Sequence, residues 1–123
     1  MKTFIIIGAI NAFLSVAFGA FGAHALEGKI SQKYIDTWNT GVLYQMFHSM
    51  GILIIGVLMG NIASSSLLNW SGWLMLIGIV LFSGSLYILS LSGIKVLGAI
   101  TPLGGVAFLI AWILLIITAV KSM

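Results

Sequence analysis

Several residue types are scarce or absent in this chain of 123 residues, and each absence removes a class of chemistry. There is no cysteine, which excludes disulfides, thiolate metal sites and cysteine nucleophiles. Arginine is also absent, and the chain has only one proline and two carboxylates. Charged residues make up 6% of the chain, against about 25% in an ordinary soluble domain. Because so few charges do not cover a water-facing surface, we expect the chain to lie in lipid.

The positive charge of the chain is thinly spread. Its five lysines stand at positions 2, 29, 33, 95 and 121. A nucleic-acid-binding protein needs a dense basic face, so we expect no nucleic acid partner. Three of these lysines fall in predicted loops on one side of the membrane and two near the chain ends on the other. This difference is too small to assign an orientation by the positive-inside rule.

Hydrophobic residues make up 61% of the chain, and they gather in four long stretches. These cover about 3–25, 40–60, 70–92 and 98–119. About 20 mostly apolar residues cross the hydrocarbon core as a helix, and helices satisfy their own backbone in lipid. The runs are continuous and lack the alternation of a transmembrane β-strand. The sequence therefore predicts an all-α integral membrane protein: a single domain that forms an antiparallel bundle of four transmembrane helices.

The stretch "AFGAFGAHALEG", residues 17–28, allows a second interpretation, because Ala23-His24-Ala25 resembles the cleavage site of a secretory signal peptide. The apolar part of a signal peptide is about 7–15 residues long. The run from Phe4 to Ala23 is longer, and three further spans follow it. Cleavage would leave an odd number of helices, so we expect this stretch to be the end of a permanent first helix.

Aromatic residues mark the expected membrane boundaries, with Tyr34 and Trp38 at one side and Trp70 and Trp73 at the other. Such belts are typical of the membrane–water interface. The first loop, "EGKISQKYIDTW", has an apolar face and fits either a short surface helix or the exposed start of the second span.

Polar residues of all four spans gather near one side of the membrane. Since the spans alternate in direction, loops 1 and 3 share that side, while the other leaflet receives runs such as "ILIIGVLMG". The predicted ligand or polar cluster consists of Tyr44, Gln45, His48, Ser83, Tyr87 and Thr101. Weaker candidates are His24 and Lys95.

These residues also have structural explanations, which the sequence leaves open. Small and polar residues let transmembrane helices approach and hydrogen-bond to one another. His48 is expected to be buried, whereas His24 is expected to face headgroups or loop 1. If Thr101 caps the fourth helix, Pro102 takes the first helical position, where proline is favoured. The positive end of that helix, with Lys95 nearby, would then suit an anionic group such as a lipid phosphate.

Several activities do not fit the residues present. A proton-coupled exporter needs a carboxylate inside the membrane, but Glu27 and Asp36 lie in or near loop 1. Haem ligation by His24 and His48 would need two residues whose expected depths differ by nearly two turns. Two histidines without a buried carboxylate make a poor metal site, and a hydrolase would lack its orienting acid. We therefore predict no catalytic residues, no metal and no cofactor.

Four motifs in order, "GAFGAHAL", "WNTGVLYQMFHSMGIL", "LFSGSLYIL" and "TPLGGVAFLIAW", resemble those of the YwdK/YgdD-like family of small membrane proteins. The resemblance implies a four-helix protein of the bacterial cell membrane, and it carries over no catalytic residue. It also implies cytoplasmic chain ends, although this chain has only one lysine near each end.

Two functional hypotheses follow from the residues. The first is a non-enzymatic membrane protein that acts through helix or lipid contacts, as an oligomer or an accessory subunit. The alternative is a binder or carrier of a small amphiphile, such as a lipid or quinone, in the polar cluster. Membrane lipids are partners in both hypotheses.

Overall fold

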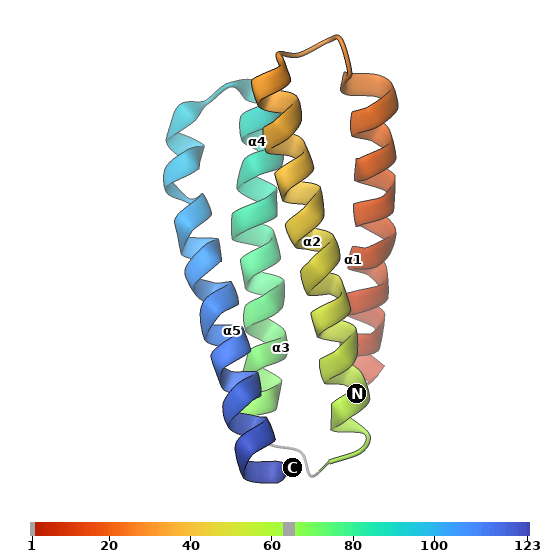
Figure 1. The fold of residues 1–123 in the computed structure, drawn as a ribbon, viewed down its shortest axis with the longest axis vertical. Helices are drawn as coiled ribbons and strands as arrows, with labels where there is room; N and C mark the ends of the chain where they lie inside the picture. Colours follow the sequence, from red (N-terminus) through yellow and green to blue (C-terminus); the bar gives the residue numbers. More distant parts are fainter. Residues whose placement is uncertain (1, 63–65) are drawn as a thin grey trace.

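The computed structural model describes residues 2–62 and 66–123, and it is a bundle of antiparallel helices (Figure 1). Helix α1 covers Lys2–Phe21 and continues into a π-helical turn, η1, at Gly22–Leu26. Helix α2 covers Gln32–Met59. The third span consists of α3 (Ser66–Gly78), the π-helical turn η2 (Ile79–Ser83) and α4 (Gly84–Ser92). The fourth begins with a 3₁₀ turn, η3 (Lys95–Ala99), and continues as α5 (Thr101–Ser122).

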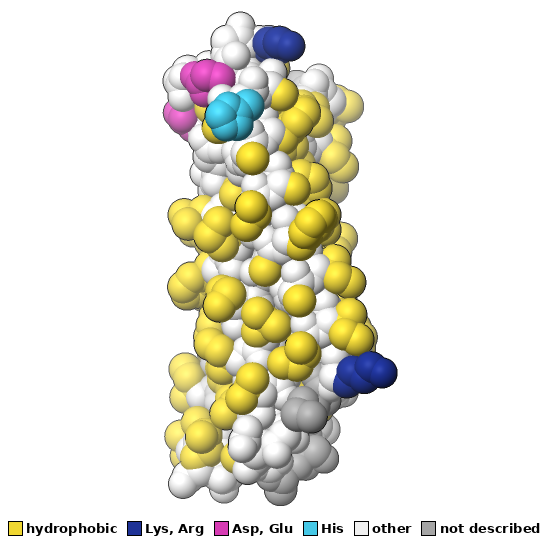
Figure 2. Space-filling model, turned by 90° about the vertical axis from the view of Figure 1, so that its right-hand side faces the viewer, with side chains coloured by type: hydrophobic (Ala, Val, Ile, Leu, Met, Phe, Trp, Pro, Cys, Tyr) yellow, Lys and Arg dark blue, Asp and Glu magenta, His cyan; other side chains and the backbone are white. Residues whose placement is uncertain are grey.

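Four segments are long and apolar enough to cross a membrane. They are Lys2–Leu26, Gln32–Met59, Ser66–Ser92 and Lys95–Ser122. The two chain ends lie at the same end of the bundle (Figure 1), as an even number of spans requires. On the face shown in Figure 2, acidic side chains, a histidine and a basic side chain lie near one end of the molecule, one further basic side chain lies toward the other end, and apolar side chains cover much of the surface between them. The predicted all-α, four-helix transmembrane fold is confirmed.

The first loop is short, because α2 begins at Gln32 rather than near residue 40. A left-handed glycine, Gly28 with φ of 81°, lies in the turn after η1. Most of the stretch "EGKISQKYIDTW" is therefore the start of α2, not a separate surface helix. Trp38 does not face the lipid, as a residue of an aromatic belt would. Its side chain is only 4% exposed, and its indole N–H donates to the carbonyl of Phe18 across the contact with α1 at 2.9 Å.

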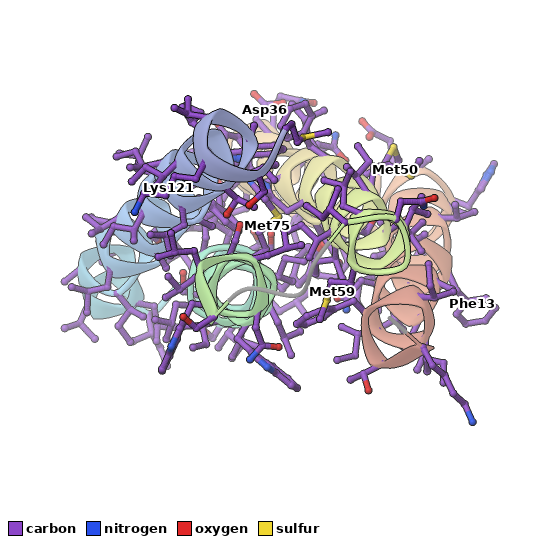
Figure 3. The ribbon with its side chains drawn as sticks, turned by 90° about the horizontal axis from the view of Figure 1, so that it is seen from below. Phe13, Asp36, Met50, Met59, Met75 and Lys121 are labelled. Carbon is purple, nitrogen blue, oxygen red and sulfur yellow. The ribbon has the colours of Figure 1, made fainter. Side chains whose placement is uncertain are left out.

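The helices pack in a row rather than as four equal neighbours. Helix α1 packs mainly along α2, and α5 packs mainly along α3 and η2, while α2 also contacts α3 and α4. Close approach of α1 and α2 depends on Gly8, because a Cβ there would lie 2.7 Å from Cγ of Leu53. Viewed along the bundle in Figure 3, Met75 points into the interior and Phe13 points away from it.

Two apolar clusters fill the interior. The larger one lies toward the chain ends and is formed by Phe4, Ile52, Ile55, Leu68, Met75, Ile79, Phe108 and Ala111. The smaller lies near loop 1 and is formed by Leu26, Ile35, Trp38 and Val42.

The half of the bundle that holds the chain ends is not pure hydrocarbon, since Ser49, Ser71 and Thr118 are buried there. The Ser71 hydroxyl donates to the carbonyl of Ala111 on α5, and the Ser49 hydroxyl donates to Met46 on its own helix. These hydroxyls pair with helix carbonyls, so burial in lipid leaves none of them unsatisfied.

Candidate functional site

The predicted polar residues lie along the inner faces of α2, η2, α4 and α5, but they form several separate contacts. Throughout the described parts of the chain, every buried polar side-chain atom has a hydrogen-bond partner. The sequence predicted one cluster, and the structure divides it into four separate hydrogen-bonded groups and one groove that faces the membrane.

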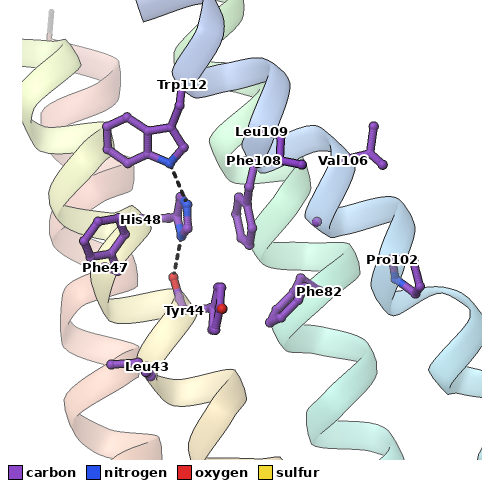
Figure 4. Close-up of a pocket in the computed structure, with 11 residues that line it drawn as sticks. Leu43, Tyr44, Phe47, His48, Phe82, Pro102, Val106, Phe108, Leu109 and Trp112 are labelled. Atoms are coloured by element: carbon purple, nitrogen blue, oxygen red, sulfur yellow. Dashed lines mark hydrogen bonds between the residues drawn. The ribbon is translucent and has the colours of Figure 1, made fainter.

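His48 on α2 occupies the centre of the first group. It is 3% exposed, and its ring stacks on that of Phe108, with centroids 3.5 Å apart and planes 8° from parallel. Its Nδ1 lies 2.9 Å from the carbonyl oxygen of Tyr44. The indole N–H of Trp112 donates to its Nε2 at 3.0 Å (Figure 4).

These two partners fix the protonation state of the imidazole. A carbonyl only accepts and an indole N–H only donates, so Nδ1 carries the proton and Nε2 offers its lone pair. His48 is therefore a neutral histidine whose two nitrogens are both engaged. A metal ion or haem iron would have to displace Trp112 to reach Nε2. This arrangement supports the structural reading of His48: it joins α2 to α5.

His24 does not approach His48. It lies in η1 and its side chain is exposed, because α1 widens into the π-helical turn and does not break at Gly22. Among residues 2–62 and 66–123, no three histidine or carboxylate side chains converge on one point.

A chain of three polar side chains joins α1, α2 and α4. The Tyr87 hydroxyl donates to Oε1 of Gln45 at 2.7 Å. The amide of Gln45 in turn donates to Oδ1 of Asn11 at 3.1 Å, and Asn11 donates to the carbonyl of Ile7. Asn11 and Gln45 are buried, so this chain fixes the register of the three helices.

Ser83 and Thr101 make the remaining contacts between spans. Ser83, in η2, donates to the carbonyl of Gly41 at 2.7 Å. The hydroxyls of Ser85 and Thr101 lie 2.6 Å apart. Since Ser85 also donates to the carbonyl of Phe82, Thr101 is the donor in the pair.

The start of α5 differs from the expectation, because Ile100 rather than Thr101 holds the cap position and Pro102 is the second helical residue. The turn η3 leads directly into the helix, and the N–H of Leu103 bonds to the carbonyl of Ile100. The Thr101 hydroxyl is thereby left to bond with Ser85. Lys95 is exposed in η3, so it joins none of these buried contacts.

A groove of about 660 Å³ opens between α2 and α5. Its floor consists of aromatic rings from both helices and from η2, among them His48, Phe82, Phe108 and Trp112 (Figure 4). Its rim consists of aliphatic and aromatic side chains on the outer surface, including Leu43 (62% exposed) and Leu109 (66% exposed). The groove is therefore open to the hydrocarbon of the membrane.

The width of the groove depends on how α5 approaches η2. A Cβ at Gly104 would press against the backbone nitrogen of Phe82 and lie 2.8 Å from its Cα, so only glycine permits this approach. Gly105, the next residue, lines the groove, and a Cβ there would meet only Cδ2 of Phe82, at 4.0 Å.

Tyr44 is the one predicted site residue with an unpaired polar group in the groove. Its ring packs on Phe82, with centroids 4.4 Å apart, and the side chain is 39% exposed. Its hydroxyl has no hydrogen-bond partner among the residues that the structure describes. In hydrocarbon an unpaired polar group is unfavourable, so this hydroxyl is suited to bond with a molecule in the groove.

Sequence reasoning missed the residues that α5 and η2 contribute to this site, namely Phe82, Phe108 and Trp112. In the sequence of an apolar span, aromatic residues do not stand out from other residues that face lipid or fill the core. The spacing of Phe108 and Trp112, four residues apart, places both on one face of a helix, and this was the available signal.

The fold and these contacts define a multi-pass α-helical membrane protein with an aromatic groove between its second and fourth spans. Comparison with known proteins also indicates a membrane protein. Residues 18–105 match the family model described as "Protein of unknown function (DUF423)", and the chain belongs to that family. It is similar to the UPF0382 membrane protein YwdK of Bacillus subtilis, with 58% identity over 98% of each chain.

Relatives in staphylococci show the same likeness. The chain is 54% identical to the UPF0382 membrane protein SERP0230 of Staphylococcus epidermidis and 57% identical to SAB0533 of Staphylococcus aureus, again over 98% of each chain. These relatives are bacterial proteins named as membrane proteins, and the predicted family and multi-pass membrane location are confirmed. No solved structure matches the chain.

Proposed function

We propose that this protein is a non-enzymatic membrane protein that binds a small amphiphile in the groove between α2 and α5. The observation that carries the proposal is the groove itself, at about 660 Å³ and with an aromatic floor. Pockets for small molecules typically measure about 300–1,000 Å³ and are mostly apolar with a few polar groups. The groove opens toward lipid, so an amphiphile enters it from the membrane without crossing water.

The polar side chains support a binding role rather than a catalytic one. His48, Gln45 and Tyr87 are each engaged in contacts between spans. The proposal therefore moves the amphiphile from the predicted polar cluster to the adjacent groove, and it retains Tyr44 and His48 in its lining.

The test is to extract the protein gently in a mild detergent or polymer and to measure retained lipids by native mass spectrometry. The wild-type chain is expected to carry one tightly held amphiphile per protein. Gly105→Leu fills the groove, and this variant is expected to lose the amphiphile.

The matched control is Gly84→Leu on α4, where an added Cβ would meet nothing within 4 Å and which lies outside the groove lining. This variant is expected to retain the amphiphile. A wild-type protein free of bound amphiphile, or equal retention by the two leucine variants, would overturn the proposal. The groove would then be a contact surface for a helix of a partner subunit or of a second copy.

A further inference from the structure

A second hollow extends the groove along α2. It measures about 310 Å³ and is lined by Met46, Met50, Gly51 and Ile54, together with three residues that also line the first: Leu43, Phe47 and Trp112. The two hollows therefore adjoin each other along α2, and the shared rings of Phe47 and Trp112, whose centroids are 5.7 Å apart, lie at their junction. Together the two hollows extend from the level of Pro102, near loop 3, toward the end of the bundle that holds the chain ends.

The two hollows are lined by different types of residue. The part near Pro102 has an aromatic floor with Tyr44, Phe82 and Phe108, and planar rings pack well on such faces. The part near Ile54 is lined by aliphatic residues and methionines, which adapt to irregular flexible chains. An occupant with a flat ring at one end and a long hydrocarbon chain at the other matches this order.

The depth of Tyr44 decides what kind of polar group the ring carries. Tyr44 follows Asp36, the last charged residue of α2, by eight residues, which is about 12 Å along the helix axis. A lipid phosphate stays at the level of the charged residues and does not reach this depth. Neutral carbonyl or hydroxyl oxygens are tolerated there, and the unpaired Tyr44 hydroxyl is able to donate to one of them.

We propose that the groove and the adjoining hollow together bind a ring-headed isoprenoid of the membrane-quinone class. Its oxygen-bearing ring lies on Phe82 and Phe108 and accepts a hydrogen bond from Tyr44, and its chain extends past Trp112 toward Ile54. This inference rests on the proposed function, since it names the amphiphile that the groove takes. The ring lies beside Tyr44, near the middle of α2, and the chain extends toward the end of the bundle that holds the chain ends.

The test uses Trp112, which lies at the junction of the two hollows, as a reporter. Trp70 and Trp73, which are 58% and 37% exposed, are replaced by phenylalanine to remove signal from the lipid-facing surface. The protein in phosphatidylglycerol nanodiscs is titrated with a naphthoquinone carrying a four-isoprene chain, because quinones quench indole fluorescence on contact. We expect quenching that saturates at about one quinone per protein, whereas a quinone that merely dissolves in the bilayer quenches without saturation.

Two variants and one competitor sharpen the result. Tyr44→Phe removes only the hydroxyl, and loss of one neutral hydrogen bond weakens quinone binding about fivefold. Tyr34→Phe, outside the groove, is the matched control and leaves binding unchanged. Geranylgeraniol, which has the chain but no ring, is expected to compete poorly.

The inference is overturned by quenching that does not saturate, by equal effects of the two tyrosine variants, or by geranylgeraniol competing as well as the quinone. If native mass spectrometry then still shows a phospholipid that is held by the wild type and lost in Gly105→Leu, amphiphile binding stands and only the ring-headed class is wrong. If no amphiphile is found by either method, both proposals fall.

Discussion

Two neighbouring glycines of α5 provide a sensitive test of how the fourth span meets the third. At Gly104 an added Cβ would press on the backbone of Phe82, whereas at Gly105 it would meet only a ring atom at 4.0 Å. Alanine at either position brings the same gain in helix propensity, up to about 1 kcal/mol, and this gain cancels when the two variants are compared. The difference between Gly104→Ala and Gly105→Ala therefore measures the cost of the close approach.

The size of that cost follows from the geometry. The Cβ at position 104 would lie 2.8 Å from Cα of Phe82, and unstrained carbon contacts are about 3.5–4.0 Å, so α5 must move away from η2 by about 1 Å. Overpacking of a well-packed interior typically costs about 1–3 kcal/mol. We expect Gly104→Ala to be less stable than Gly105→Ala by about 2 kcal/mol.

The assay is equilibrium unfolding in mixed micelles, with increasing mole fraction of a denaturing detergent and helix content followed by circular dichroism. Because Phe82 belongs to the floor of the groove, Gly104→Ala is also expected to weaken amphiphile binding more than Gly105→Ala does. If Gly104→Ala unfolds at the same detergent fraction as Gly105→Ala, α5 does not approach η2 as the structure has it.

Three further predictions follow from the contacts between spans. Trp112→Phe leaves Nε2 of His48 without its hydrogen-bond donor and should lower the free energy of unfolding by about 1 kcal/mol. In the wild type, ¹⁵N NMR should show that the His48 imidazole is neutral and protonated at Nδ1. An imidazolium signal would contradict this. A double-mutant cycle of Tyr87→Phe with Gln45→Leu should give a coupling of about 0.6 kcal/mol and at most about 1.7 kcal/mol, and no coupling would mean that the pair does not bond. Because the chain has no cysteine, single cysteines report topology cleanly: an impermeant thiol reagent should label Lys29→Cys and Lys95→Cys from one side of the membrane and Lys2→Cys and Lys121→Cys from the other.

The spans were predictable because a run of about 20 apolar residues has few alternatives in a chain with so little charge. The start of α2 was not predictable from hydropathy, because Lys33 and Asp36 lower the hydropathy of a segment that is nonetheless helical. The burial of Trp38 was not predictable either. Aromatic residues near a span end usually face the interface, but this indole finds the Phe18 carbonyl inside the bundle.

The candidate site was predictable in its residues more than in its arrangement. The placement of Gln45 and His48 on one face of the second span follows from helical periodicity alone. Their hydrogen-bond partners do not follow from periodicity, because Asn11 and Trp112 lie 34 and 64 residues away in sequence. The pairing depends on which helices are neighbours. The π-helical turn η2, which places Phe82 in the groove, has no sequence pattern from which it could be predicted.

We propose that the groove between α2 and α5 holds an amphiphile, and a high-resolution structure of the protein in lipid nanodiscs would show whether this claim is right. We predict elongated density between α2 and α5, with its broad end against Phe108 and Tyr44 and its narrow end beside Met50. A groove closed by Phe47 and Leu109 packing against each other, with no room for such a molecule, would contradict the claim.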